Sequence, residues 1–137
     1  MDKAILVKQI LNNLTKANAI VLAVNEQLNS ISSSSSDSEI NKCVSEIELM
    51  FEKVRHFEAQ NQKILMKFGI ISGRYYDQFL EKLDGSNAFA VFSPVLQKYK
   101  VSIGTCKANM NLLEGVMQAR IGFLKGVVDE FNIEVKV

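Results

Sequence analysis

A coiled-coil rhythm of apolar residues near the start of the chain limits what it can fold into more than any other feature. Between positions 7 and 31 these residues recur alternately every three and every four positions: Val7, Ile10, Leu14, Ala17, Val21, Val24, Leu28 and Ile31. Such a period forms one continuous apolar stripe along a helix, and the stripe has to be buried against other helices. We therefore predict a long helix over about 2–30, as part of a helical bundle.

A serine run separates this segment from a second long helix. The five serines at 32–36 bury nothing and are predicted to form a flexible loop. Ser36 and Glu39 match a capping box, so the second helix is predicted over 37–68, closing near Gly69. Its stripe is interrupted by a polar stretch at Glu58 and Asn61 and consists of Ile40, Val44, Ile47, Phe51, Val54, Leu65 and Phe68. A short loop between two long helices makes them antiparallel.

A short third helix and a long last helix complete the predicted fold. Residues 74–83 contain closely spaced apolar residues and stop at the Asp-Gly-Ser-Asn cluster of 84–87. Ser93 followed by Pro94 has the pattern of an N-cap and a first helical residue, so the last helix is predicted over 94–131. The chain is then all-α. It is predicted to form one domain, an elongated antiparallel bundle or coiled coil of three long helices and one short helix over residues 1–137.

The last predicted helix changes character along its length. Its apolar rhythm shifts by one residue after Met117, with Arg120 at the next expected apolar position. Three of the four glycines inside this helix follow Leu113, and each costs roughly 1 kcal/mol relative to alanine. The second half also has more apolar residues than one seam can bury, namely Met117, Ile121, Phe123, Leu124, Val127, Val128 and Phe131.

These features have two explanations. The glycines could permit close helix crossing, or a weakened helix with adaptable apolar side chains could recognise a partner. The partner hypothesis predicts that Leu113, in the first half, belongs to the core. It predicts that Ile121, Leu124 and Val128, in the second half, are partly available to the partner.

Charge and hydropathy argue against several functional classes. A net charge of +1 and a pI near 7.7 do not fit a nucleic-acid-binding domain, which usually has a strong basic excess. No segment has the roughly 18 apolar residues of a membrane span, and the first residues look like helix turns instead of a signal peptide. Cys43 and Cys106 are predicted to be buried free thiols, which fits a reducing cytoplasmic location.

No catalytic, metal or cofactor site can be recognised in the sequence. The single histidine, His56, lacks the Lys and Gly that follow the phosphorylated histidine of phosphotransfer domains, so a structural role is favoured. One His and two distant Cys do not make a zinc ligand set. Glu46, Glu48 and Glu52 fit the solvated face of the second helix better than paired catalytic carboxylates. We therefore expect neither enzymatic activity nor a cofactor.

One segment of the last predicted helix carries a pattern found in a known family. Leu96 and Cys106 precede Asn111 and Gly115, and Glu114 stands immediately before Gly115. This order resembles the signature of the FlgN family of flagellar export chaperones, which has Leu, often Cys, and then Asn-x-x-Asn-Gly. Glu114 stands where that family has its second Asn. The end of the second helix, Lys-Ile-Leu-Met-Lys-Phe-Gly-Ile, is similar to the family's Leu-Leu-x-x-x-Gly-Leu, and length and helix order fit across nearly the whole chain.

The resemblance implies a cytoplasmic chaperone of the flagellar type III secretion system. Such a protein binds the C-terminal helical segments of the hook-filament junction proteins FlgK and FlgL and delivers them to the export apparatus. The client surface would lie in the C-terminal half, with the candidate residues Asn111, Glu114, Gly115, Met117, Ile121, Leu124, Val128 and Phe131. The alternative is a structural or adaptor bundle that forms a homo-oligomer through its coiled-coil seams.

Overall fold

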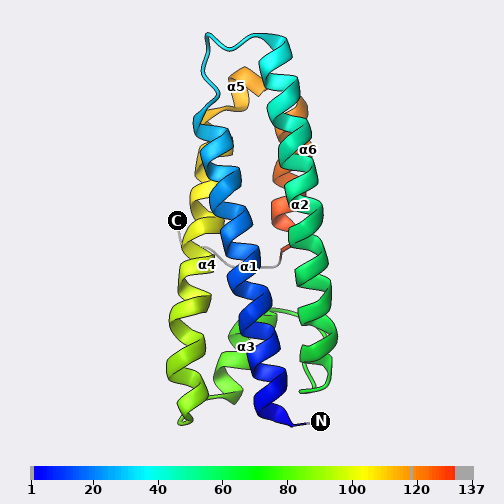
Figure 1. Cartoon of the computed structure of the whole chain (residues 1–137), viewed down its shortest axis with the longest axis vertical. Coiled ribbons are helices and arrows are strands. Elements are labelled where there is room, and N and C mark those ends of the chain that lie inside the picture. The colour runs from blue at the N-terminus through cyan, green and yellow to red at the C-terminus, as the bar shows by residue number, and fades with distance from the viewer. Residues whose placement is uncertain (1, 118, 132–137) are drawn as a thin grey trace.

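A computed structural model describes residues 2–117 and 119–131, and these form helices joined by turns (Figure 1). The helices are α1 (Lys3–Asn29), α2 (Asp37–Met66), α3 (Tyr75–Lys82), α4 (Asn87–Leu112), α5 (Glu114–Met117) and α6 (Ala119–Asp129). α2 runs antiparallel to α1 and α4, and α1 packs against both along its length. The predicted all-α bundle of three long antiparallel helices is confirmed. No helix in the described part of the chain is both long and apolar enough to cross a membrane.

The apolar stripe of α1 lies at the centre of the core. Its first turn is capped by the Asp2 carboxylate, which accepts a hydrogen bond from the Ala4 amide at 3.0 Å. Near its other end, the Asn25 side-chain amide donates to the Ser102 carbonyl of α4 at 3.2 Å. The buried apolar side chains of α1 are Leu6, Ile10, Leu14, Ala17, Val21, Val24 and Leu28. Burying one large aliphatic side chain contributes about 1.5–3 kcal/mol, so this stripe accounts for much of the stability.

The turn between α1 and α2 is closed by the predicted capping box. The Ser36 hydroxyl accepts a hydrogen bond from the Glu39 amide at 3.1 Å, and the Glu39 carboxylate accepts one from the Ser36 amide at 3.4 Å. At the other end of α2, Gly69 adopts a φ of 82°, and the Ile70 amide donates to the Leu65 carbonyl at 3.1 Å. Only glycine adopts this left-handed conformation without strain, so the chain turns there.

The predicted start of the last helix at Pro94 is wrong, because α4 begins seven residues earlier, at Asn87. Ser86 is the N-cap and accepts a hydrogen bond from the Phe89 amide. The two extra turns bury Phe92 completely, with its ring 5.2 Å from that of Phe79 in α3. Pro94 sits on the exposed side of α4, where water can reach the carbonyl that its missing amide leaves unpaired. Tertiary burial of Phe92 therefore outweighs the local cost of an internal proline.

The predicted continuous helix over 94–131 is also wrong, because the chain breaks at Leu113. After the single turn of α5 the chain reverses, and α6 runs back along α2 and α4 (Figure 1). An unbroken helix over 94–131 would be about 57 Å long, about 12 Å longer than the 30-residue α2. Its last turns would project beyond the bundle with no partner. Folding back gives their apolar side chains a place in the core.

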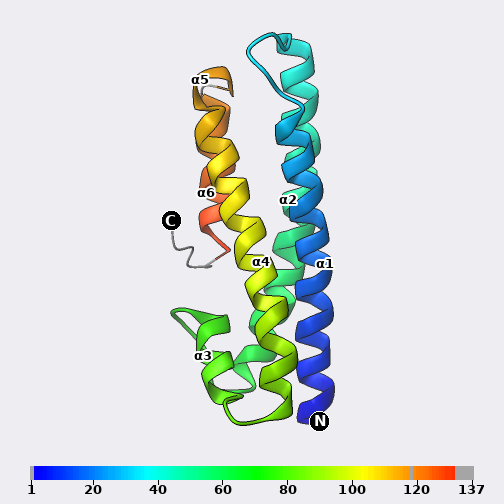
Figure 2. The ribbon, with the colours of Figure 1, turned by 90° about the vertical axis from the view of Figure 1, so that its left-hand side faces the viewer.

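α6 and α3 share the fourth position of the bundle. Both pack against α2 and α4, with α6 near the serine loop and α3 near the opposite end (Figure 2). α3 contributes the buried Tyr76 and Phe79, whereas Leu80 and Leu83 are half-buried. The fourth position is thus filled by two separate short helices instead of one long one.

The serine loop is expected to tolerate lengthening. Its hydroxyls bond mainly to one another and to Glu39, and Ser32, Ser33 and Ser34 are exposed. Doubling a flexible loop costs only about 0.6 kcal/mol of closure entropy. Insertion of Gly-Ser repeats between Ser33 and Ser34, which spares the capping box, should therefore leave the urea midpoint of unfolding almost unchanged. A large loss of stability would mean that the loop packs against the bundle.

Candidate functional site

The structure places three of the predicted partner-binding residues in the core. Leu124, Val128 and Phe131 have exposed fractions of only 0%, 1% and 2%. The Phe131 ring meets that of Phe51 in α2 edge-on, with centroids 5.8 Å apart. We expected the side chains of Leu124 and Val128 to be partly accessible to a partner, but they are inaccessible while α6 is docked. A partner can reach these positions only if α6 leaves.

The other candidate residues lie around the break between α4 and α6. Asn111, Glu114 and Gly115 are exposed, and they stand beside Leu112, whose exposed fraction of 81% is the largest of any large apolar residue described. Glu114 forms an ion pair with Lys125 of α6 at 3.1 Å. The candidates Met117 and Ile121 belong to α5 and α6, but their side chains fall outside the described part of the structure. The break thus presents a polar rim with one exposed leucine.

The glycines of this region do not serve close helix crossing. A Cβ atom built on Gly115, Gly122 or Gly126 would meet nothing within 4 Å. All three face open space, where alanine would fit and would favour the helix. For these three glycines, the explanation based on close helix crossing is therefore excluded. These glycines therefore lower the stability of the helix at positions where its packing would allow alanine.

The polar contacts that hold α6 are exposed ion pairs. Arg55 of α2 contacts Glu130 at 2.9 Å, and Lys107 of α4 contacts Asp129 at 3.3 Å. These side chains are 32–71% exposed, and exposed pairs of this kind contribute about 0–1 kcal/mol each. An isolated helix of 11 residues is also marginal in water. The docking of α6 therefore depends chiefly on its buried apolar face.

A buried polar network lies near the middle of α4, where α3 also contributes a side chain, and sequence analysis did not identify it. The Glu58 carboxylate of α2 accepts hydrogen bonds from the hydroxyls of Tyr76 in α3, at 2.9 Å, and Tyr99 in α4, at 2.8 Å. The Asn61 side-chain amide donates to the Tyr76 hydroxyl at 3.1 Å and accepts from Asn13 of α1 at 2.9 Å. Five polar side chains therefore join the three long helices and α3.

The sequence did contain a signal for this network. Glu58 and Asn61 continue the three-four rhythm between Val54 and Leu65, so they occupy seam positions of α2 and not its solvated face. A polar residue at a seam position has to find partners on the facing helices. Tyr76 and Tyr99, whose hydroxyls are those partners, also lie on the apolar faces of α3 and α4.

Burial governs the charge of Glu58. Loss of contact with water raises the pKa of its carboxyl to about 7, and the hydrogen bonds from Tyr99 and Tyr76 partly oppose that rise. No cation in the described part of the chain forms an ion pair with it. The pKa values of Tyr76 and Tyr99 are raised well above 10 by burial and by Glu58. The network thus holds a carboxyl that keeps its proton to a much higher pH than a solvent-exposed glutamate does.

The cysteines and the histidine have simpler surroundings. Cys43 and Cys106 are both buried free thiols, as predicted. Burial raises the pKa of Cys43 and raises that of Cys106 to about 12, so both thiols keep their protons at neutral pH. His56 is exposed on α2, and its Nε2 atom lies 3.1 Å from the Gln60 side-chain nitrogen.

Comparison with known proteins adds no relatives: no family model matches the chain, and no curated protein or solved structure resembles it significantly.

Truncation of Leu124 is expected to undock α6. Leu124→Ala should weaken docking by about 2–5 kcal/mol, because Leu124 is fully buried and a cavity would remain. Leu113→Ala should cost less, because Leu113 is only half-buried. Hydrogen exchange measures the effect: amide protection in 119–129 should fall in the Leu124 variant and persist in the Leu113 variant. Equal protection in both would contradict the docked position of α6.

Stability should fall as pH rises, because the folded state holds the Glu58 proton more tightly than the unfolded state. The carboxyl titrates near pH 4.5 when unfolded and near pH 7 when folded. Between these values the folded state binds more protons, so the free energy of unfolding should fall by about 2–3 kcal/mol from about pH 5 to about pH 8. Urea unfolding should show this fall in the wild type and in the Glu48→Gln control. Glu58→Gln should remove most of it, and an unchanged slope in that variant would rule out Glu58 as the cause.

Proposed function

We propose that this protein is a cytoplasmic export chaperone that binds an amphipathic helical segment of a client protein. The resemblance to the FlgN family supports a flagellar role, in which the clients are the hook-filament junction proteins FlgK and FlgL. The chaperone would shield their C-terminal helices from premature assembly and deliver them to the export apparatus of the type III secretion system. This function needs no cofactor and no catalytic residue.

The observation that carries the proposal is that α6 buries apolar core surface but has few other features that hold it in place. This helix and Phe131 after it cover core side chains such as Phe51. The helix is nevertheless short, contains two glycines that its packing does not require, and is held by exposed ion pairs. A client helix with apolar residues at three-four spacing would bury the same surface in its place. A disordered client segment would fold as it binds.

The ion pairs that hold α6 indicate which charges such a client should carry. Arg55 and Lys107 pair with Glu130 and Asp129 at the end of α6. If the client replaces α6, carboxylates near the end of its apolar stripe would restore both ion pairs. Asn111 and Gly115 are exposed at the turn where α4 ends, so they can contact the client directly. Glu114 is also exposed there, and it would exchange its Lys125 partner for the client when α6 leaves.

Strengthening α6 should weaken client binding. Gly122→Ala and Gly126→Ala together should stabilise α6 by about 1–2 kcal/mol, because the added methyl groups meet open space. In calorimetric titrations with a peptide from the C-terminal helix of a FlgK-type junction protein, this should lower the affinity about fivefold or more. Asn41→Ala, at an exposed position of α2, is the control that favours a helix elsewhere.

The outcome separates the proposal from the adaptor alternative. Unchanged affinity in the glycine variant would show that the client does not replace α6. The adaptor bundle is favoured by the exposed Leu22 of α1 and Val101 of α4, which line one shallow groove and are 51% and 58% exposed. A sedimentation series that reveals an oligomer, together with no binding of the junction peptide by the wild type, would establish that alternative.

A further inference from the structure

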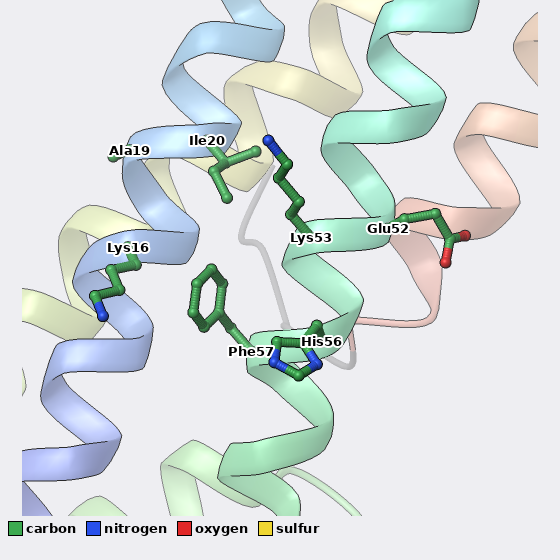
Figure 3. A pocket seen from close by; sticks show the side chains of 7 residues that line it. All are labelled: Lys16, Ala19, Ile20, Glu52, Lys53, His56 and Phe57. Atoms are coloured by element: carbon green, nitrogen blue, oxygen red, sulfur yellow. The ribbon is translucent and has the colours of Figure 1, made fainter.

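The outer groove between α1 and α2 is a second surface with the character of a binding site. Figure 3 shows the Phe57 ring between the two helices, with Lys53 extending towards Ile20 of α1. The groove has a volume of about 580 Å³, and its apolar lining consists of Ala19, Ile20 and Phe57. α4 packs on the far side of the α1–α2 pair, so this groove is separate from the surface that α6 covers (Figure 3).

The rim of this groove carries positive charge that nothing in the described structure neutralises. Lys16 lies over the Phe57 ring, 5.9 Å from its centroid, and forms no ion pair with a described residue. Lys53 also lacks a described carboxylate partner. The one acidic residue of the lining, Glu52, is paired with Arg55, and its carboxylate points away from Phe57 (Figure 3).

The sequence of α1 places no negative charge beside this groove. Lys3, Lys8 and Lys16 are its only charged residues before Glu26, so α1 has no carboxylate over most of its length. A second, polar groove continues from Lys16 towards the N-terminal end of α1 and adds Lys63 of α2. The α1–α2 groove thus has an apolar floor at Ala19, Ile20 and Phe57, and its cationic border at Lys16 and Lys53 continues to Lys63 in the polar groove beside it.

We propose that the α1–α2 groove binds an acidic amphipathic helix of a partner protein. A groove between two antiparallel helices accepts a third helix through apolar side chains at i, i+3 or i+4, and i+7. Such side chains would contact Ile20 and Phe57, while Asp or Glu residues on both sides of the stripe would pair with Lys16 and Lys53. This surface is independent of the client site proposed under α6, so either proposal can fail alone.

A designed peptide tests this proposal directly. The probe is a fluorescein-labelled peptide of about five helical turns, with leucines at three-four spacing and glutamates on both sides of the stripe. Its matched control has lysine at every glutamate position. Fluorescence anisotropy of the full-length protein should show binding of the glutamate peptide and at least tenfold weaker binding of the lysine peptide.

Variants then locate the binding surface. Lys16→Glu with Lys53→Glu should weaken binding of the glutamate peptide about tenfold or more. Lys8→Glu with Lys42→Glu makes the same charge change on the same two helices outside the groove and should have less than about a twofold effect. Melting curves should confirm that both double variants, which alter exposed side chains, remain folded.

Several results would overturn the proposal. Absence of binding, equal binding of the two peptides, or equal losses in the two double variants would exclude specific recognition in this groove. A loss caused by Gly122→Ala with Gly126→Ala would instead place the peptide at the α6 site. If sedimentation shows a homo-oligomer that Lys16→Glu with Lys53→Glu dissociates, the occupant is a second copy of this chain and not a partner helix.

Discussion

The buried carboxyl of Glu58 lies where side chains of α2, α3 and α4 meet. Apolar seams alone fix the register of packed helices weakly, because a shift along the stripe exchanges one aliphatic contact for another. A buried carboxyl cannot shift in this way, since it is stable only where hydrogen-bond donors meet it. Here the donors are Tyr76 of α3 and Tyr99 of α4, while Asn61 connects the same network to Asn13 of α1. We infer that this network sets the register of the bundle, at the cost of some stability above neutral pH.

With α4 held near its middle by Tyr99, its length decides what happens at its C-terminal end. α4 has 26 residues against 30 in α2, so it already reaches the region of the serine loop when it stops at Leu112. The remaining apolar residues have to fold back, and they enter the space between α2 and α4 that α3 leaves empty. Different parts of the bundle are therefore held together by different kinds of contact. The region around Glu58 is joined by hydrogen bonds among four helices, whereas α6 is held by a short apolar face and exposed ion pairs. The second arrangement is typical of segments that open locally.

The sequence predicts the parts of this fold that depend on periodicity. The stripes of α1 and α2, the capping box at Ser36 and the turn at Gly69 follow from local chemistry that tertiary contacts do not change. Two predictions failed because tertiary contacts outweighed local signals. Burial of Phe92 carries α4 through Pro94, and the finite length of its neighbours ends it at Leu113 although the three-four rhythm continues. The length mismatch was present in the sequence, since a helix over 94–131 exceeds any predicted partner. At the candidate site, composition identified the weakened helix but not its burial, because a stripe does not show which element covers it.

The two proposed surfaces differ in how charge enters binding, and this difference follows from their present contacts. At the α6 site, Arg55 and Lys107 already have partners in Glu130 and Asp129, so a client that replaces α6 exchanges one set of ion pairs for another. The net electrostatic gain is small, and affinity there depends on how well the client's apolar face competes with that of α6. In the α1–α2 groove, Lys16 and Lys53 have no carboxylate partners among the described residues, so an acidic helix would form ion pairs that did not exist before. Such binding is accelerated by long-range attraction and weakened by salt. If both proposals hold, one surface would select by packing and the other by charge, and one bundle would bind two different helices at once without competition between them.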